Sequence, residues 1–305
     1  MAETSRPLDT SFATTQEASK NPRRHIPWKP IVVYGILILG LVQAIFPFLW
    51  MLSASFMSVG EITLGAMLPS ELRFGNYQQA WDQAAFGQYM WNSARITAIT
   101  IIGQLVVCVP AAYAFARINF FGKNFIFGLI LATLMIPEVA TFIPNYLTVI
   151  WIGRLSDSLI GIPWFDNWPA LTIPFMASAF TIFLLRQFFM QIPEDFWDAA
   201  RIDGAGHLRY LISVVMPLSR APVMTIVTFA FIGAWNALLW PIMVTQTQAW
   251  RPVAVGLTNF VSNEAPNQLH LQMAASVMMI IPILILYFFT QRHFTEGIAS
   301  SGVKG

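Results

Sequence analysis

Long uncharged stretches dominate this sequence. Five of them contain no Asp, Glu, Lys or Arg, and a sixth, residues 124–153, carries a single acid, Glu138. A helix needs about 20 apolar residues to cross the hydrocarbon core of a membrane, so each stretch is long enough to be a span. Continuous apolar stretches also lack the alternation that is typical of a transmembrane barrel. The five uncharged stretches are residues 30–60, 96–116, 167–185, 221–250 and 265–291.

These stretches predict an all-α membrane protein, because only helices or closed barrels satisfy the backbone hydrogen bonds in lipid. Only 10% of the residues are charged, against about 25% in soluble domains. We expect one membrane domain over residues 30–292, with a polar tail at 1–29 and a short tail at 293–305. The six expected transmembrane helices lie at about 31–57, 94–116, 125–150, 168–190, 219–244 and 271–291.

Positive charge is unevenly divided between the segments that connect the expected spans. If both termini face the cytoplasm, thirteen Lys and Arg residues lie inside, and only Arg73, Arg95, Arg154 and Arg251 lie outside or near the outer boundary. Cytoplasmic loops of membrane proteins are enriched in Lys and Arg. We therefore expect cytoplasmic termini, with the segment between the fourth and fifth spans on the same side.

That segment is polar and contains two glycines. It has the sequence IPEDFWDAARIDGAGHLRY over residues 192–210. Pro193 suits the first position of a helix, and Gly204 suits a left-handed cap at its end. The predicted helix has about three turns, too few to cross a membrane. It could sit in a groove of a cytoplasmic partner and transmit that partner's movement, or it could be an ordinary interfacial loop helix.

The segment resembles the EAA loop of the membrane subunits of ABC importers. That signature is E-A-A, three residues, G, nine residues, I, one residue, L-P. The spacing here is complete, from Asp198 through Gly204 to Pro217, with Asp198, Val214 and Met216 in place of Glu, Ile and Leu. The resemblance implies a coupling helix that docks on an ATP-hydrolysing subunit. The coupling residues it implies are Glu194, Asp198, Ala199, Ala200, Asp203, Gly204, Ala205 and Pro217.

Other stretches are similar to importer permeases of the carbohydrate type, a group that includes the smaller maltose-transporter subunit. They are FGNYQQAW, AAYAFARINFFGK, MIPEVATFIPNYL and FIGAWNALLWP. The resemblance covers about residues 31–305 and implies the type I ABC importer fold, in a bacterial or archaeal plasma membrane. It also implies the partners: a second permease subunit that is homologous or identical to this one, two ATP-binding cassette ATPases that use ATP and Mg, a solute-binding protein that is extracellular or periplasmic, and a sugar or sugar derivative as substrate.

Three polar or aromatic residues inside the expected spans are candidates for a substrate path. Glu138 falls near the middle of the third span, where a charge must face protein or water, find a partner or be protonated. It could line the path, or it could hydrogen-bond a neighbouring helix. Trp235 could stack on a sugar and Asn236 could bind a sugar hydroxyl, or both could serve interhelical packing.

Several kinds of chemistry have no support in the sequence. It contains no G-x-x-x-x-G-K-[ST] phosphate-binding loop, and its four histidines and one cysteine, Cys108, show no metal-ligand spacing. We therefore expect a non-catalytic subunit with no cofactor or metal of its own and no nucleic-acid partner. A stand-alone transporter driven by an ion gradient is the main alternative. It would need several acidic or basic residues inside the membrane, whereas Glu138 is the one such residue well inside the expected spans. A membrane-embedded enzyme is a second alternative, but no catalytic constellation is visible.

Overall fold

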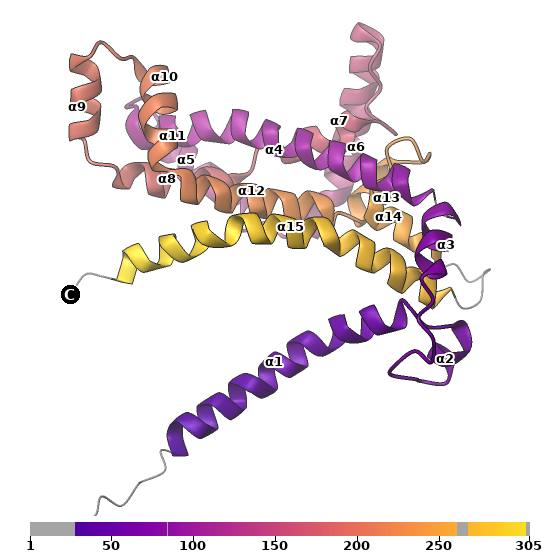
Figure 1. Ribbon diagram of the computed structural model, residues 1–305. Helices are drawn as coiled ribbons and strands as arrows, with labels where there is room; N and C mark the ends of the chain where they lie inside the picture. The colour runs from indigo at the N-terminus through magenta and orange to yellow at the C-terminus, as the bar shows by residue number, and fades with distance from the viewer. Residues whose placement is uncertain (1–27, 84, 261–267, 303–305) are drawn as a thin grey trace, which may run out of the picture. The chain divides into compact units, whose positions relative to one another are not determined.

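The computed structural model describes residues 28–83, 85–260 and 268–302, which are helical with connecting turns and contain no strand (Figure 1). The chain divides into two compact units, Met1–Pro47 and Phe48–Gly305. Most of the expected polar tail, residues 1–27, lies outside the described residues. The expected C-terminal tail begins inside a helix, because α15 runs from Leu269 to Gly302.

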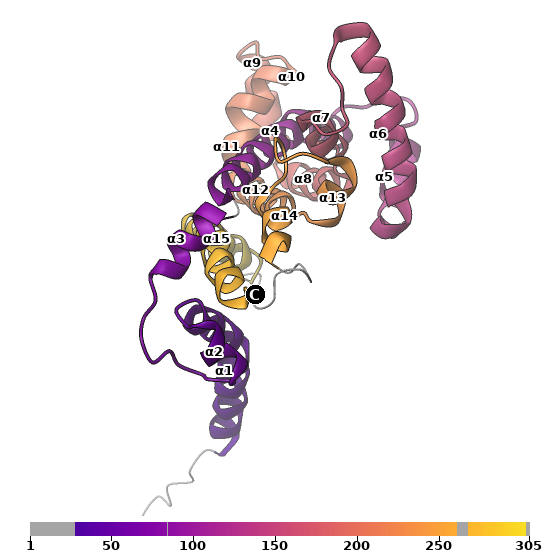
Figure 2. The same ribbon diagram turned by 90° about the vertical axis from the view of Figure 1, so that its right-hand side faces the viewer.

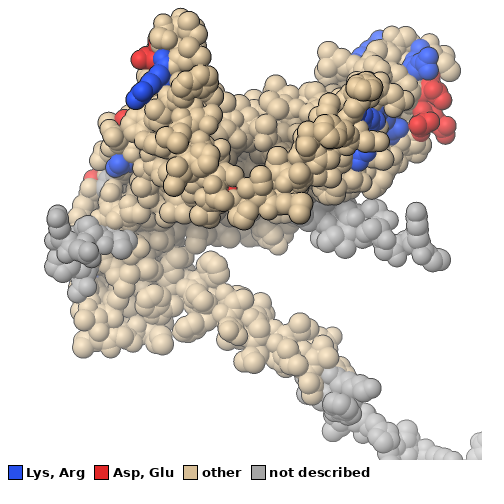
Figure 3. Space-filling view, turned by 180° about the vertical axis from the view of Figure 1, so that it is seen from behind, with Lys and Arg blue, Asp and Glu red and all other residues tan. Residues whose placement is uncertain are grey.

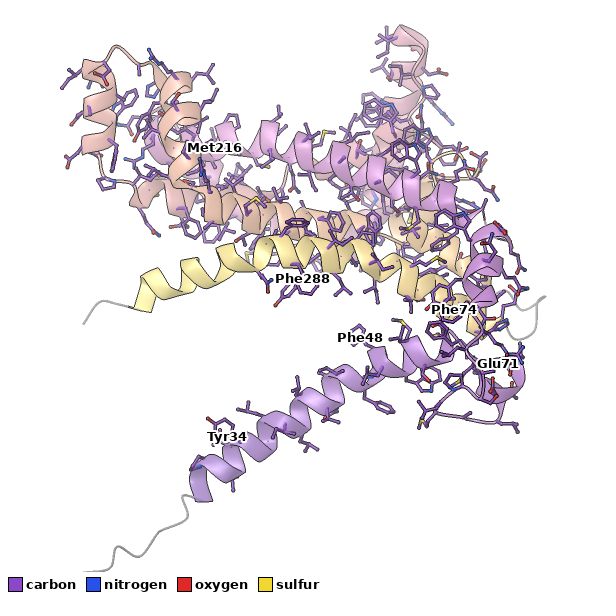
Figure 4. All side chains as sticks on the ribbon, viewed as in Figure 1. Tyr34, Phe48, Glu71, Phe74, Met216 and Phe288 are labelled. Carbon is purple, nitrogen blue, oxygen red and sulfur yellow. The ribbon has the colours of Figure 1, made fainter. Side chains whose placement is uncertain are left out.

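Three helices are long and apolar enough to cross a membrane without interruption. They are α1 (Trp28–Ala54), α4 (Phe86–Arg117) and the Leu269–Gln291 part of α15. The apolar side chains of α1 are exposed along the helix, and Tyr34, for example, is 64% exposed. On α15, Phe288 is 63% exposed and projects away from the helix (Figure 4). Apolar surface of this extent is suited to lipid rather than to water.

Three further segments meet the same criterion only as bent pairs of helices, so the count reaches six if each pair is one span. The bends are 103° between α5 and α6, 41° between α7 with η1 and α8, and 84° between the α10–α11 segment and α12. The bounds are α5 Lys123–Thr133, α6 Glu138–Ile160, α7 Trp168–Thr172, η1 Ile173–Phe175, α8 Ala179–Gln191, α10 His207–Tyr210, η2 Leu211–Val215, α11 Met216–Leu218 and α12 Arg220–Trp235.

Three of the expected spans are wrong as continuous helices, and one of them, 168–190, breaks at 176–178 between η1 and α8. Residues 125–150 break at 134–137, where Pro137 cannot donate the backbone hydrogen bond that an uninterrupted helix needs. Residues 219–244 break at 236–238, after which the chain resumes as α13 (Leu239–Val244). All three breaks leave backbone groups outside regular helix, which is tolerated at membrane depth only inside protein or beside a wet cavity.

Within the second unit, α4 packs against α8 and α12, and α12 packs in turn against α15 (Figures 1 and 2). The largest buried cluster joins the second half of α4 to α8 and to the segment after α9 (Asp195–Ile202), with Leu185, Phe189 and Val215 fully buried. A second cluster, around Phe86 and Tyr89, joins α4 to α3 (Gly75–Gln83), α14 (Val253–Leu257) and α15. The short η3 helix (Thr258–Phe260) follows α14.

The segment after α1 is fixed by one carboxylate. Glu61 in α2 (Val59–Thr63) accepts hydrogen bonds from Ser70 and Ser58 through their side chains and backbone N–H groups. These bonds, led by the one from the Ser70 hydroxyl, lower the pKa of Glu61 to about 2. The stabilisation is therefore present above the ordinary carboxyl pKa and is lost only as the pH falls toward about 2.

Close packing between α14 and α4 makes Gly256 a sensitive position. A Cβ atom at Gly256 would lie 2.7 Å from Cδ2 of Tyr89, and that ring is only 2% exposed, so it has little room to move. We predict that Gly256→Ala lowers the free energy of unfolding by about 1–3 kcal/mol through overpacking. Thermal unfolding in detergent would measure the loss.

Gly128 in α5 is the matched control, because a Cβ atom there meets nothing within 4 Å. Gly128→Ala should leave the unfolding temperature unchanged or slightly raised. Equal unfolding temperatures for the two variants would contradict the close approach of α14 to α4.

Candidate functional site

The polar segment between α8 and α12 forms a short helix whose C-terminal end is capped by backbone hydrogen bonds. The helix α9 ends at Ile202, and Gly204 follows with a φ of +73°. The Gly204 N–H donates to the Arg201 carbonyl at 3.0 Å, and the Ala205 N–H donates to the Ala200 carbonyl at 2.8 Å. These two bonds make a Schellman motif, which requires a left-handed residue at the Gly204 position. The expected glycine cap is confirmed. Pro193, by contrast, precedes the N-cap residue Glu194 and is not the first helical residue.

Aromatic contacts fix α9 against the rest of the second unit. The Trp197 ring stacks on His207 with a centroid separation of 4.5 Å and an interplanar angle of 13°. His207 Nδ1 shares a 2.8 Å hydrogen bond with the hydroxyl of Tyr113, which belongs to α4. Tyr210 closes the group with its ring centroid 5.0 Å from that of Trp197. We call Trp197, His207, Tyr113 and Tyr210 the aromatic clamp.

Two arginines tie the ends of α4 and α8 together just before α9 begins. Arg117 at the end of α4 donates to the carbonyls of Phe189 and Ile192, at the end of α8. In return, Arg186 of α8 donates from Nε to the Phe115 carbonyl of α4 at 3.0 Å. The last carbonyls of a helix have no partner within the helix, so each arginine satisfies carbonyls at the end of the other helix. The base from which α9 departs is therefore rigid.

The outer surface of α9 and α10 is charged and carries exposed apolar side chains. Figure 3 shows acidic and basic side chains gathered at this end of the second unit, at the upper right of that view. Among the predicted coupling residues, Ala200 is buried against the core and Ala205 is half-buried. Figure 4 places Met216 where the segment turns toward α12. The exposed predicted residues are Glu194, Asp198, Ala199, Asp203, Gly204 and Pro217, and the exposed apolar ones are Phe196, Ile202, Leu208 and Ile212.

A cavity of about 550 Å³ lies in the second unit, between α4, α6, α8, α12 and α13. The helix breaks at 134–137 and 236–238 meet it: Glu138 is the first residue of α6, and residues 236–238 connect α12 to α13. Its wall is mixed. The aromatic lining residues are Phe142, Phe175, Phe180, Phe229 and Trp240, and those with polar side chains are Thr100, Gln104, Glu138, Ser178, Thr181 and Asn236.

The structure brings two of the three predicted path residues into this lining. Glu138 and Asn236 line the cavity, and both are exposed. Asn236 donates from Nδ2 to the Ile232 carbonyl at 3.0 Å. Trp235 lies elsewhere: it is 3% exposed, its Nε1 donates to the Met279 carbonyl, and its ring stacks on Phe231. Its position favours the packing role over contact with a solute.

Three lining residues were not among the predicted path residues: Thr100, Gln104 and Trp240. Thr100 and Gln104 stand four residues apart on α4, so they share one helix face, and this spacing within an uncharged stretch was an available signal. The Trp240 ring is held by a 2.8 Å hydrogen bond from Nε1 to the Ala170 carbonyl. That contact joins residues 70 positions apart, and no local pattern predicts it.

Residues 105–300 match the model of the family described as "Binding-protein-dependent transport system inner membrane component". The chain belongs to this family. It is thus a multi-pass membrane permease. It is 30% identical over 280 residues to the sn-glycerol-3-phosphate transport system permease protein UgpE of Yersinia enterocolitica, covering 89% of this permease and 96% of that protein. UgpE of Brucella abortus is 29% identical over 289 residues, with 90% and 98% of the two chains covered.

The permease also resembles solved structures over most of its length. A chain of a bacterial ABC transporter involved in the import of the acidic polysaccharide alginate matches with a TM-score of 0.78 and 26% identity, covering 88% of this permease and 96% of that chain. A chain of an alginate ABC transporter in complex with a periplasmic protein bound to an alginate pentasaccharide has a TM-score of 0.62 at 11% identity, covering 87% and 95%, and shows the fold alone. The all-α ABC importer permease fold is confirmed.

The Schellman motif yields a prediction for Gly204. A β-branched residue resists a positive φ, so Gly204→Val should distort the link between α9 and α10 while membrane insertion stays largely intact. We expect transport per ATP hydrolysed to fall several-fold in the assembled importer. The measurement is uptake alongside phosphate release in proteoliposomes.

Gly206 provides the matched control, since its φ is −82° and a Cβ atom there meets nothing within 4 Å. Gly206→Val should transport nearly as well as the unsubstituted permease. ATP-dependent uptake that is unchanged in Gly204→Val would count against the turn.

Proposed function

We propose that this permease is one of two membrane subunits of an ATP-driven importer for a sugar or sugar derivative. The observation that carries the proposal is α9, a polar, exposed helix held rigidly between two membrane segments in a member of the binding-protein-dependent family. Such a helix suits one task, which is to transmit the movement of a docked subunit to the spans.

The partner subunits are inferred from a missing phosphate-binding loop and from the exposed surface of α9 and α10. This chain has no phosphate-binding loop, so the energy comes from two separate ATPase subunits, which use ATP and Mg. These subunits dock on the exposed surface of α9 and α10, where apolar Phe196, Ile202 and Leu208 lie beside acidic side chains. A second permease subunit, homologous to this one, completes the path. An extracellular or periplasmic binding protein delivers the solute, as the solved alginate importer complex illustrates for that system.

The proposed orientation places both termini and α9 in the cytoplasm. The distribution of Lys and Arg supports it, with thirteen such residues inside and four outside. The membrane is the plasma membrane of a bacterium or archaeon. Closure of the ATPases would then draw the coupling helices of the two permeases together and switch the cavity from inward-facing to outward-facing access.

The chemistry of the cavity supports a polyhydroxy solute. Exposed aromatic rings of the lining, Phe180 and Phe229, can stack on the C–H faces of a sugar, and the amides of Gln104 and Asn236 offer hydrogen-bonding groups. Wall composition of this kind, mostly apolar with a few placed polar groups, is typical of small-molecule sites. The relatives are named for a glycerol phosphate and an acidic polysaccharide; both solutes carry hydroxyl groups, which supports the polyhydroxy class, and both are anions, so the relatives do not support an uncharged solute.

Reconstitution distinguishes this function from ion-coupled transport. Proteoliposomes that contain this permease with its partner subunits and binding protein should take up a labelled sugar from a panel only when ATP is enclosed with the ATPases. The purified chain alone should give no uptake under a proton or sodium gradient. Uptake by the chain alone would overturn the proposal in favour of a secondary transporter.

The docking surface yields a separate prediction. Asp198 is exposed in the first turn of α9, so Asp198→Lys reverses a charge on the proposed surface and also opposes the helix dipole. We expect the amount of ATPase that co-purifies with the permease to fall at least several-fold. Asp82→Lys, the same charge reversal on an exposed residue of α3, is the control and should leave the complex intact. Recovery of the complex at normal yield with Asp198→Lys would contradict the docking site.

A further inference from the structure

The lining of the 550 Å³ cavity contains one ionisable side chain, the carboxylate of Glu138, and no Lys, Arg or His. Glu138 opens α6, a helix of 23 residues, and the positive end of a helix dipole stabilises a carboxylate in the first turn. Among the described residues, no side chain forms a hydrogen bond or an ion pair with this carboxylate. Its charge therefore faces whatever enters the cavity.

The two arginines that neighbour lining residues in the sequence, Arg95 and Arg251, interact with groups other than Glu138. Arg95 directly precedes the lining residue Ile96 in α4, but its guanidinium lies 4.0 Å from the centre of the Trp250 ring and donates to Asn92. Arg251 precedes the lining residue Pro252 and donates to the Thr245 carbonyl. Neither arginine is part of the lining, so the charge of Glu138 is not balanced within the cavity wall.

Neutral polar groups in the wall can accept hydrogen bonds. Gln104 donates from Nε2 to the Phe175 carbonyl at 3.1 Å, which fixes its Oε1 as an acceptor, and that oxygen is buried without a partner among the described residues. Thr100 is 4% exposed, and its buried hydroxyl likewise has no partner there. Leaving buried polar groups without a hydrogen bond is costly, so a movement of the wall that exposes these two oxygens to solute hydroxyl groups would be compensated by the hydrogen bonds that form.

We infer that Glu138 sets the charge selectivity of this cavity, which accepts an uncharged polyhydroxy solute and rejects an anionic one. Solute hydroxyls can donate to the carboxylate and to neutral acceptors in the wall, whereas a phosphate or carboxylate group would meet a like charge. The inference rests on the proposed function for its substrate class, but the charge of the cavity can be tested without any substrate.

Thiol-reactive probes measure that charge directly. Cys108 is the sole cysteine of this permease, so in a Cys108→Ala background every modification measured on this subunit is at an introduced thiol. Ala237→Cys then places one thiol in the lining. The assembled importer is treated with two methanethiosulfonates of similar size, one neutral with a hydroxyethyl group and one anionic with a sulfonatoethyl group. The ratio of the neutral to the anionic modification rate is compared with and without Glu138→Gln.

We expect Glu138→Gln to lower this ratio about tenfold, the scale of a unit charge a few ångströms away in a partly wet site. The control is Leu64→Cys, at an exposed position outside the cavity, where the ratio should not respond to Glu138→Gln. If Glu138→Gln also leaves the ratio at Ala237→Cys unchanged, the inference is overturned, even if the importer is fully active.

Uptake tests the same inference in transport. If the importer takes up neutral sugars, excess glycerol 3-phosphate should compete poorly with the unsubstituted permease and about tenfold better with Glu138→Gln. Equal competition in both would overturn the role of Glu138. If no sugar of the panel is taken up at all, the proposed substrate class fails, while the thiol assay still decides the charge of the cavity.

Discussion

The stacking of Trp197 on His207 is the contact that links the short helix α9 to the membrane helices. A helix of eight residues is too short to be stable by itself in water, and α9 is of this length. Its shape must therefore come from tertiary contacts. The hydrogen bond between His207 and Tyr113 extends the stack to α4, and the mutual capping by Arg117 and Arg186 fixes α4 to α8. A push on α9 therefore reaches two membrane helices through rigid contacts rather than through a flexible loop.

The cavity is the other consequence of how the spans are built. A continuous helix satisfies its own backbone and presents only side chains, whereas a broken one exposes polar groups that need protein or water. The breaks at 134–137 and 236–238 both meet the cavity, and Glu138 and Asn236 stand at their edges. Discontinuous helices around a central site are a recurrent device in transporters. The same feature that interrupts two spans thus supplies much of the polarity of the wall.

Local features of the fold were predictable because they have local causes. Uncharged stretches gave the approximate positions of the spans, and Gly204 gave the end of α9, since the left-handed cap depends on one residue. Pro137 and Pro144 predict a kink in the third span but not the 103° bend between α5 and α6, because a proline can kink a helix slightly or end it, and tertiary packing decides which. The aromatic clamp and the burial of Trp235 join residues far apart in the sequence, so no spacing rule reveals them. Glu138 was identified as an intramembrane charge, but its place in a cavity wall without cations required the structure.

The clamp should carry the movement of a docked ATPase into the membrane, and the number of solute molecules taken up per ATP hydrolysed tests this most directly. In proteoliposomes with the complete importer, Trp197→Ala should retain ATP hydrolysis and lose most uptake, because α9 can still dock but no longer moves α4. Ser213→Ala, an exposed position in the same segment, serves as the reference. If Trp197→Ala assembles normally and transports as many molecules per ATP as the reference, the aromatic clamp does not transmit the stroke, and this account of coupling is wrong.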